Sequence, residues 1–294
     1  MDLASLRGSA EVLKVAARHD VYPFIDPKVH YDAQTLAGRV VLITGASRGI
    51  GLETALHFVR AGASLTIVAR KQEALDASRD TILRERPSAQ VFTFPADVRD
   101  VKKAEEAVAA TVTRFGRLDI LVANAGSLRA SFQPFASEDP TKWWEIMEVN
   151  IRGTYNFIHF AVPELQKTKG RIVMTSSRAA QLRIPCSSEY CTSKHTLIRF
   201  AEFISIEYPD LKVFCVHPGT VATELTVEYE GRASRDEDSP ALCAAAILYL
   251  ISGRADYLSG RYVAATWDLG EVERDWKEKI VSQEALVSKL HIPQ

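Results

Sequence analysis

The chain has 294 residues, 47% of them hydrophobic and 25% charged, with a formal net charge of −1. This is the composition of a globular protein with one large domain or two small ones. The balanced charge, without a sustained basic stripe, argues against a nucleic-acid partner. The four cysteines form no CxxC pair and no His/Cys cluster, so we expect no metal site, no disulfide framework and a reducing, cytoplasmic location.

The first 38 residues are interpreted as an N-terminal arm. Residues 3–18 have the pattern of a basic amphipathic helix, either a surface helix or a transit peptide, although Asp2 and Glu11 argue against the latter. Tyr22-Pro23 and Asp26-Pro27 break any helix further on. There is no apolar signal-peptide core, and the longest apolar run, residues 241–251, is too short to cross a bilayer, so we expect no membrane partner.

From residue 39 onward, short apolar runs alternate with helical patterns. The predicted strands are residues 39–44, 64–69, 90–95, 120–123, 171–175, 212–217 and 262–264. The predicted helices are residues 52–61, 73–85, 101–115, 142–167, 188–208 and 241–251. This alternation predicts an α/β fold: a Rossmann-like, doubly wound, mainly parallel seven-stranded sheet with helices on both faces. We expect a single domain over 39–269, with a substrate lid at the acidic stretch 220–240, and a C-terminal extension over 270–294.

A glycine-rich turn lies between the first predicted strand and the first predicted helix. It reads Thr44-Gly45-Ala46-Ser47-Arg48-Gly49-Ile50-Gly51. Glycines allow the backbone to turn sharply and to approach a pyrophosphate, while the helix N-terminus offers unpaired N–H groups. A purely structural turn is the alternative, but the strand–turn–helix context favours dinucleotide binding.

The end of the second predicted strand indicates which dinucleotide is bound. A carboxylate here would bind a ribose 2′-hydroxyl and repel a 2′-phosphate. The chain instead has Arg70 and Lys71, and Arg48 lies in the glycine-rich turn. Cations at this point favour NADP(H) over NAD(H), unless Arg70 and Lys71 only begin a solvated helix.

Tyr190 and Lys194 are four residues apart, which on a helix places them on one face. A tyrosine with an ordinary pKa of about 10 exchanges protons poorly at neutral pH, and a nearby cation favours its charged form. The pair is therefore a candidate acid/base device. By itself a Tyr–Lys pair at this spacing more often lies on an exposed helix surface without a catalytic role, so the catalytic interpretation depends on the other motifs.

Taken together and in order, these motifs resemble the short-chain dehydrogenase/reductase family, in its common single-domain form, over residues 38–264. After the glycine-rich turn come Asp97-Val98, Asn124-Ala125-Gly126, Asn150 in the long helix, Ser177, Tyr190-x-x-x-Lys194 and Pro218-Gly219-x-Val221-x-Thr223. They follow predicted strands at the edge where doubly wound sheets bind ligands.

The resemblance implies a catalytic tetrad of Asn150, Ser177, Tyr190 and Lys194. Tyr190 exchanges a proton with a carbonyl or alcohol oxygen, Lys194 holds the nicotinamide ribose, Ser177 holds the substrate oxygen, and Asn150 supports a water relay. Ser176 is the fallback for Ser177, which is preferred for its spacing from Tyr190. The implied cofactor contacts are Gly45, Ser47, Arg48, Gly49, Ile50, Gly51, Arg70, Lys71, Asp97, Val98, Asn124, Ala125, Gly126, Tyr190, Lys194, Pro218, Gly219, Val221 and Thr223.

The implied reaction interconverts a carbonyl and an alcohol on a small, fairly apolar substrate by hydride transfer with NADP(H). The family places the substrate pocket between residues 127–135, residues 178–186 and the lid, lined by Phe132, Phe135, Leu182, Ile184 and Tyr229. Arg129, Arg178 and Arg183 could meet an acidic group but are more often solvated. The open alternatives are an epimerase, a dehydratase or an imine reductase using the same site, and a non-catalytic NADP-binding scaffold.

The resemblance also implies a homodimer or homotetramer, paired through the long helices around residues 143–164 and 193–208. Residues 260–268 stand where the family has a glycine-rich ending and do not match it. The arm and the C-terminal extension are additional to the family pattern. These departures put the family's tetramer contacts in doubt.

Overall fold

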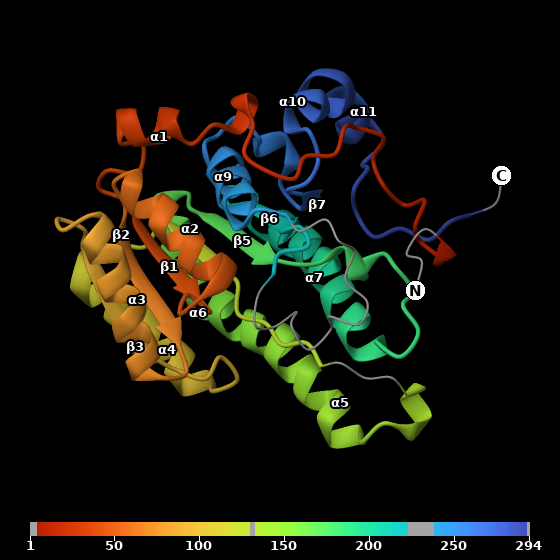
Figure 1. Ribbon diagram of the computed structural model, residues 1–294, viewed down its shortest axis with the longest axis horizontal. Helices are drawn as coiled ribbons and strands as arrows, with labels where there is room; N and C mark the ends of the chain where they lie inside the picture. The colour runs from red at the N-terminus through yellow and green to blue at the C-terminus, as the bar shows by residue number, and fades with distance from the viewer. Residues whose placement is uncertain (1–4, 130–132, 223–237, 293–294) are drawn as a thin grey trace.

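The computed structural model describes residues 5–129, 133–222 and 238–292. Its centre is a seven-stranded sheet in the order β3-β2-β1-β4-β5-β6-β7 (Figure 1). All six strand pairings are parallel, so the sheet is parallel throughout rather than mainly parallel. The strands are β1 Val40–Thr44, β2 Ser64–Ala69, β3 Val91–Pro95, β4 Ile120–Ala123, β5 Arg171–Thr175, β6 Lys212–His217 and β7 Arg261–Ala264. The predicted fold class is confirmed.

Helices cover both faces of the sheet. The α2 helix packs against α3 and α9, whereas α4 packs against α6 on the other face. The helices are α1 Lys28–Ala33, α2 Gly49–Arg60, α3 Gln72–Glu85, α4 Val101–Phe115, α5 Pro140–Met147, α6 Gly153–Thr168, α7 Ser188–Glu207, α9 Pro240–Ile251, α10 Leu269–Glu271 and α11 Lys277–Ser282. Within the described residues, no helix is long and apolar enough to cross a bilayer.

The central strand β1 shows why the sheet forms. All five of its residues are buried, and they are β-branched or leucine, as expected of a strand covered on both faces. Thr44 pairs with Val68 on β2 and with Ala123 on β4. Consequently the glycine-rich turn leaves β1 between the carboxyl ends of these two strands.

Both ends of α4 follow ordinary capping chemistry. The Asp100 side chain accepts a hydrogen bond from the Lys103 N–H at the start of α4, and Gly116, with φ +80°, ends that helix.

The helix expected over 142–167 is instead three consecutive pieces. A π-helical turn, Glu148–Arg152, separates α5 from α6 and contains Asn150. Because a π-turn admits an extra residue, it shifts the direction of the side chains around Asn150.

The amphipathic helix expected over residues 3–18 is wrong for the described residues, because residues 6–18 contain no helix. This segment has turns and then a single antiparallel bridge, Ala17 to Trp267. It lies along the segment after β7 (Figure 1). Besides local turns, its backbone makes hydrogen bonds with distant residues, from the Arg18 N–H to the Thr266 carbonyl oxygen at 2.8 Å and from the Asp268 N–H to the Ala16 carbonyl oxygen at 2.9 Å, and these contacts outweigh a local helical pattern.

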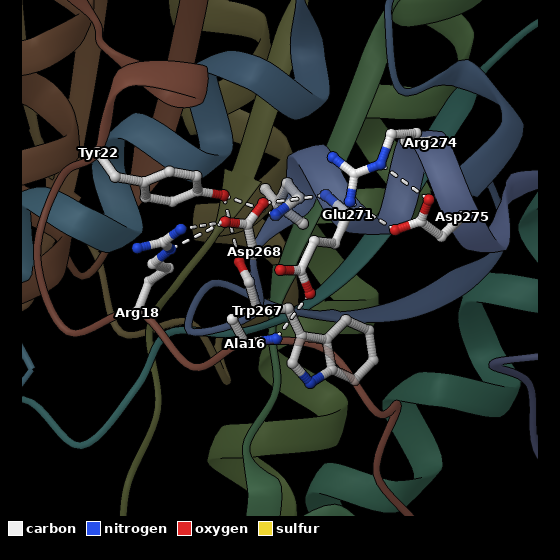
Figure 2. Close-up of polar contacts among 9 residues, drawn as sticks. Ala16, Arg18, Tyr22, Trp267, Asp268, Glu271, Arg274 and Asp275 are labelled. Atoms are coloured by element: carbon white, nitrogen blue, oxygen red, sulfur yellow. Dashed lines mark hydrogen bonds and ion pairs between the residues drawn. The ribbon is translucent and has the colours of Figure 1, made fainter.

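Two side chains fix the arm to the segment that follows β7 (Figure 2). The Arg18 guanidinium donates to the Asp268 carboxylate at 2.6 and 2.9 Å. The buried Tyr22 hydroxyl accepts the Leu269 N–H at 2.6 Å and donates to the Trp267 carbonyl oxygen at 3.3 Å. The arm is thus packed on its own chain.

Candidate active site

The glycine-rich turn is formed by close backbone contacts. Gly45 and Gly49 have φ of +67° and +54°, in the left-handed region that favours glycine. A Cβ on Gly51 would lie 2.3 Å from the Gly45 carbonyl oxygen. The turn leads directly into α2, whose first turn has no acidic residue. This is a backbone cradle at a helix N-terminus, which suits an anionic phosphate group.

Asn124 holds this turn in place. Its amide Nδ2 donates to the carbonyl oxygens of Thr44 and Gly45, both at 3.2 Å, and its Oδ1 accepts from the Thr175 hydroxyl at 3.2 Å. The side chain therefore ties together the ends of β1, β4 and β5. Contact of this residue with an adenosine ribose remains a prediction.

Cations follow the two neighbouring strands β1 and β2. Arg48 is exposed in the glycine-rich turn after β1, and Arg70 and Lys71 are exposed directly after β2. Asp97, which follows β3, is joined to Arg99 by paired hydrogen bonds, the shortest at 2.7 Å. The Arg99 guanidinium, with a smaller contribution from Arg70, lowers the pKa of the Asp97 carboxyl. Arg99 was not singled out by the sequence motifs, although its position two residues after Asp97 was a usable signal.

Lys194 lies under the Tyr190 ring. Its Nζ is 5.7 Å from the ring centroid and donates to the Thr175 carbonyl oxygen at 2.8 Å. The Lys194 side chain is buried, and burial lowers its pKa to about 8. Tyr190 is half-buried. The amine is therefore held between the last carbonyl of β5 and the phenol ring one helical turn away.

Asn150 is fully buried in the π-turn beside the same amine. Its Oδ1 accepts the Ser127 N–H at 2.7 Å, and its Nδ2 donates to the Ser127 carbonyl oxygen and to the Ser193 hydroxyl, both at 2.9 Å. A Cβ built on Gly126 would lie 3.2 Å from Lys194 Nζ and 3.4 Å from Asn150 Oδ1. Asn150, Gly126 and Lys194 therefore meet at one point, and Ser127 is a partner that the motifs did not identify.

The two candidate serines after β5 differ in what they contact. The buried Ser176 hydroxyl donates to the Lys194 carbonyl oxygen at 3.1 Å and so supports helix α7. The half-buried Ser177 hydroxyl accepts the Ala179 N–H at 3.1 Å, which leaves its proton for another acceptor. Ser177 therefore remains the better candidate for holding a substrate oxygen.

The turn after β6 begins at a buried histidine. Burial, and to a smaller extent Arg178, lowers the pKa of His217 to about 3, so its ring is neutral at physiological pH. Its Nδ1 can therefore accept the Gly219 N–H, 3.4 Å away. Pro218 and Val221 are buried beside it. Thr223 lies outside the described residues.

The predicted substrate side is described only in part, because Phe132, Tyr229 and most of the predicted lid lie outside the described residues. Leu182 is buried and Ile184 half-buried. Arg129 is paired with Glu138, and Arg183 with Glu11 of the arm. These two arginines therefore already have carboxylate partners.

A cavity of about 490 Å³ lies at the start of α5, lined by Phe135, Glu138, Pro140, Trp143 and Trp144. It contains none of the predicted tetrad. It is nevertheless connected to the tetrad's helix, because Trp143 Nε1 donates to the Ser188 hydroxyl at 3.0 Å, two residues before Tyr190. No group of three His, Cys, Asp or Glu side chains able to hold a metal occurs among the residues that the structure describes.

Comparison with known proteins identifies the class to which this fold and site belong. The family model of short chain dehydrogenases matches residues 39–233. A short chain dehydrogenase of Monascus purpureus is 40% identical over 263 residues, covering 86% of this chain and 89% of the relative. The chain therefore belongs to the short-chain dehydrogenase/reductase family of oxidoreductases.

Two further relatives extend this comparison. The 11-beta-hydroxysteroid dehydrogenase-like 3 protein of Arabidopsis thaliana is 37% identical, covering 76% of this chain and 74% of the relative. The crystal structure of levodione reductase superposes with a TM-score of 0.73 at 26% identity, covering 82% of this chain and 100% of that one.

Proposed function

We propose that the chain interconverts a carbonyl and an alcohol on a small, fairly apolar substrate, using a nicotinamide dinucleotide. The observation that carries this proposal is the meeting of Lys194 Nζ, the Tyr190 ring and the Thr175 carbonyl oxygen at the carboxyl end of the sheet. This arrangement supports a role for the Tyr190 phenol as a proton donor, because the nearby Lys194 cation stabilises the charged form of the phenol.

The residues present fit such a cofactor. Gly51 lets the glycine-rich turn fold tightly at the start of α2, because a Cβ there would lie 2.3 Å from the Gly45 carbonyl oxygen, and the first turn of α2 has no acidic residue that would repel a pyrophosphate. The carboxyl edge of the sheet, at the switch between β1 and β4, is where doubly wound folds bind dinucleotides. The bound nicotinamide ring would supply or accept hydride at the reacting carbon.

Each member of the tetrad then has a separate task in the proposed reaction. Tyr190 donates its phenolic proton to the carbonyl oxygen during reduction and takes it back during oxidation. Ser177 donates a hydrogen bond to the same oxygen and so orients the carbonyl. Lys194 provides positive charge beneath the Tyr190 ring, and Asn150 keeps the loop at Ser127 against the amine.

We propose NADP(H) as the preferred dinucleotide. Arg70 and Lys71 are exposed at the end of β2, and Arg48 is exposed in the glycine-rich turn that follows the neighbouring strand β1. The nearby carboxylate of Asp97 is neutralised by Arg99 at 2.7 Å. A 2′-phosphate would therefore meet net positive charge in this region, whereas a ribose hydroxyl would find no free acid at the tip of β2.

Deuterium transfer tests the proposed reaction. NADPH and NADH carrying deuterium at the reactive carbon would be incubated with a panel of ring ketones that includes levodione, and the alcohols analysed by mass spectrometry. We expect deuterium on the carbinol carbon with the wild-type chain and at least about a hundredfold less with Tyr190→Phe. Tyr208→Phe, at the far end of α7, is the matched control. Equal deuterium transfer by Tyr190→Phe would refute the role of Tyr190.

A further inference from the structure

Asp238 holds the turn that follows β6. Its Oδ2 accepts the Thr220 N–H at 2.6 Å, and its own N–H donates to the Thr220 carbonyl oxygen at 2.8 Å. The two residues are 18 positions apart in the chain. The Asp238 side chain is only 6% exposed. This double contact fixes the turn at residues 218–221 to the segment that begins α9.

The turn is also shaped around this carboxylate. Gly219 has φ +100°, and a Cβ at this position would lie 2.7 Å from Asp238 Oδ2. The backbone of Gly219 therefore passes directly against the carboxylate, a closeness that only glycine permits. A shift of Asp238 would move the turn with it.

The second carboxylate oxygen of Asp238 contacts the N-terminal arm. His19 Nδ1 lies 2.7 Å from Asp238 Oδ1, and the His19 carbonyl oxygen accepts the Ser239 N–H at 2.9 Å. The neighbouring Arg18 is itself fixed, because its N–H donates to the Thr266 carbonyl oxygen at 2.8 Å and its guanidinium is paired with Asp268. His19 is thus presented to Asp238 from a segment held against the end of β7.

We propose that Asp238 is a positioning residue for the nicotinamide end of the cofactor, and that His19 of the arm keeps its carboxylate in place. This inference rests on the proposed function and on the cofactor contacts that the family resemblance implies at Pro218, Gly219 and Val221, which we place beside the nicotinamide ring. The arm then contributes to cofactor geometry through one chain of contacts: His19 to Asp238, and Asp238 to Thr220. Neither His19 nor Asp238 belongs to the motifs found in the sequence.

The test compares the whole dinucleotide with its adenosine end. Isothermal titration would measure the Kd of the preferred dinucleotide and of the fragment without nicotinamide, 2′,5′-ADP for NADP(H) or ADP for NAD(H). For Asp238→Ala we expect the dinucleotide Kd to rise at least about tenfold, while the fragment Kd changes less than about twofold. If Asp238 only stabilised the fold, its replacement would raise the Kd of the dinucleotide and of the fragment by the same factor.

Two further variants refine the test. Asp238→Asn should restore dinucleotide binding to within about threefold of wild type, because an amide oxygen can still accept the Thr220 N–H. His19→Ala removes only the arm contact of a side chain that is 59% exposed, and should weaken dinucleotide binding about threefold with the fragment unaffected. If Asp238→Ala does not fold, His19→Ala still provides the comparison of dinucleotide binding with fragment binding.

Matched controls come from the opposite end of the sheet. Asp256→Ala removes a carboxylate bonded at 2.6 Å to Arg171, and His30→Ala removes an arm histidine bonded at 2.9 Å to Thr35. In neither control variant should the Kd of the dinucleotide rise more than the Kd of the fragment. If the Asp238 and His19 variants bound the dinucleotide and the fragment more weakly by the same factor, this inference alone would be overturned. The same holds if these variants bound both ligands as tightly as the wild-type chain. Absence of dinucleotide binding by the wild-type chain would refute the proposed function, and this inference with it.

Discussion

The Lys194 amine lies beneath the Tyr190 ring, with Nζ 5.7 Å from the ring centroid. Its 2.8 Å hydrogen bond to the Thr175 carbonyl oxygen fixes it at the end of β5. Because the amine is buried, its pKa falls from 10.5 to about 8. The amine is therefore charged at neutral pH and loses its charge within an experimentally accessible range.

This shift predicts the pH dependence of carbonyl reduction. A lysine with a lowered pKa is positive below about pH 8 and neutral above it, so kcat/KM for reduction should fall as pH rises through about 8. The measurement is kcat/KM for a ketone substrate between about pH 6 and 10. In Lys194→Arg the guanidinium stays charged, so the fall near 8 should be absent from the remaining activity. A flat wild-type profile would contradict this role of Lys194.

The glycine-rich turn predicts an unusual outcome for Gly51→Ala. Within a helix this exchange ordinarily stabilises a protein by about 1 kcal/mol. Here the new methyl group would lie 2.3 Å from the Gly45 carbonyl oxygen and 2.6 Å from Asn124 Nδ2. We expect a lower melting temperature and at least about tenfold weaker dinucleotide binding. Unchanged binding with a raised melting temperature would show that the cradle is not needed.

The arm predicts a stability effect at Tyr22. Replacement by Phe removes the hydroxyl that accepts the Leu269 N–H at 2.6 Å, leaving a buried donor unpaired. Urea denaturation should show a loss of about 1–3 kcal/mol in the free energy of unfolding. Tyr155→Phe, whose residue is 48% exposed, is the control and should change this free energy by under about 0.5 kcal/mol. Equal losses in both variants would exclude the arm as a stabilising element.

The arrangement of the sheet was predictable because its signals are local. Strands such as β4 and β5 are short apolar runs between helical patterns, and their predicted ranges agree with the observed ones. Parallel pairing followed from the alternation with helices. The glycine-rich turn was recognisable because glycines are needed at Gly45 and Gly49, where φ is positive.

Contacts between distant parts of the chain were not predictable in this way. The helix predicted for residues 3–18 does not form over residues 6–18, where hydrogen bonds with residues around Trp267, about 250 positions away, replace it. Helical periodicity could not distinguish the π-turn at Asn150 from ordinary helix. Asp238 was interpreted only as part of an acidic stretch, because its partners His19 and Thr220 come close only in the folded chain.

Equilibrium titration of NADPH and NADH tests the central claim most directly, with nicotinamide fluorescence as the signal. We predict saturable binding with NADPH at least about tenfold tighter, equivalent to about 1.4 kcal/mol. Arg70→Ala should remove this difference, whereas Arg84→Ala, an exposed arginine of α3, should preserve it. Equal affinities in the wild-type chain would contradict the preference for NADP(H). Absence of binding by both dinucleotides would contradict the account as a whole.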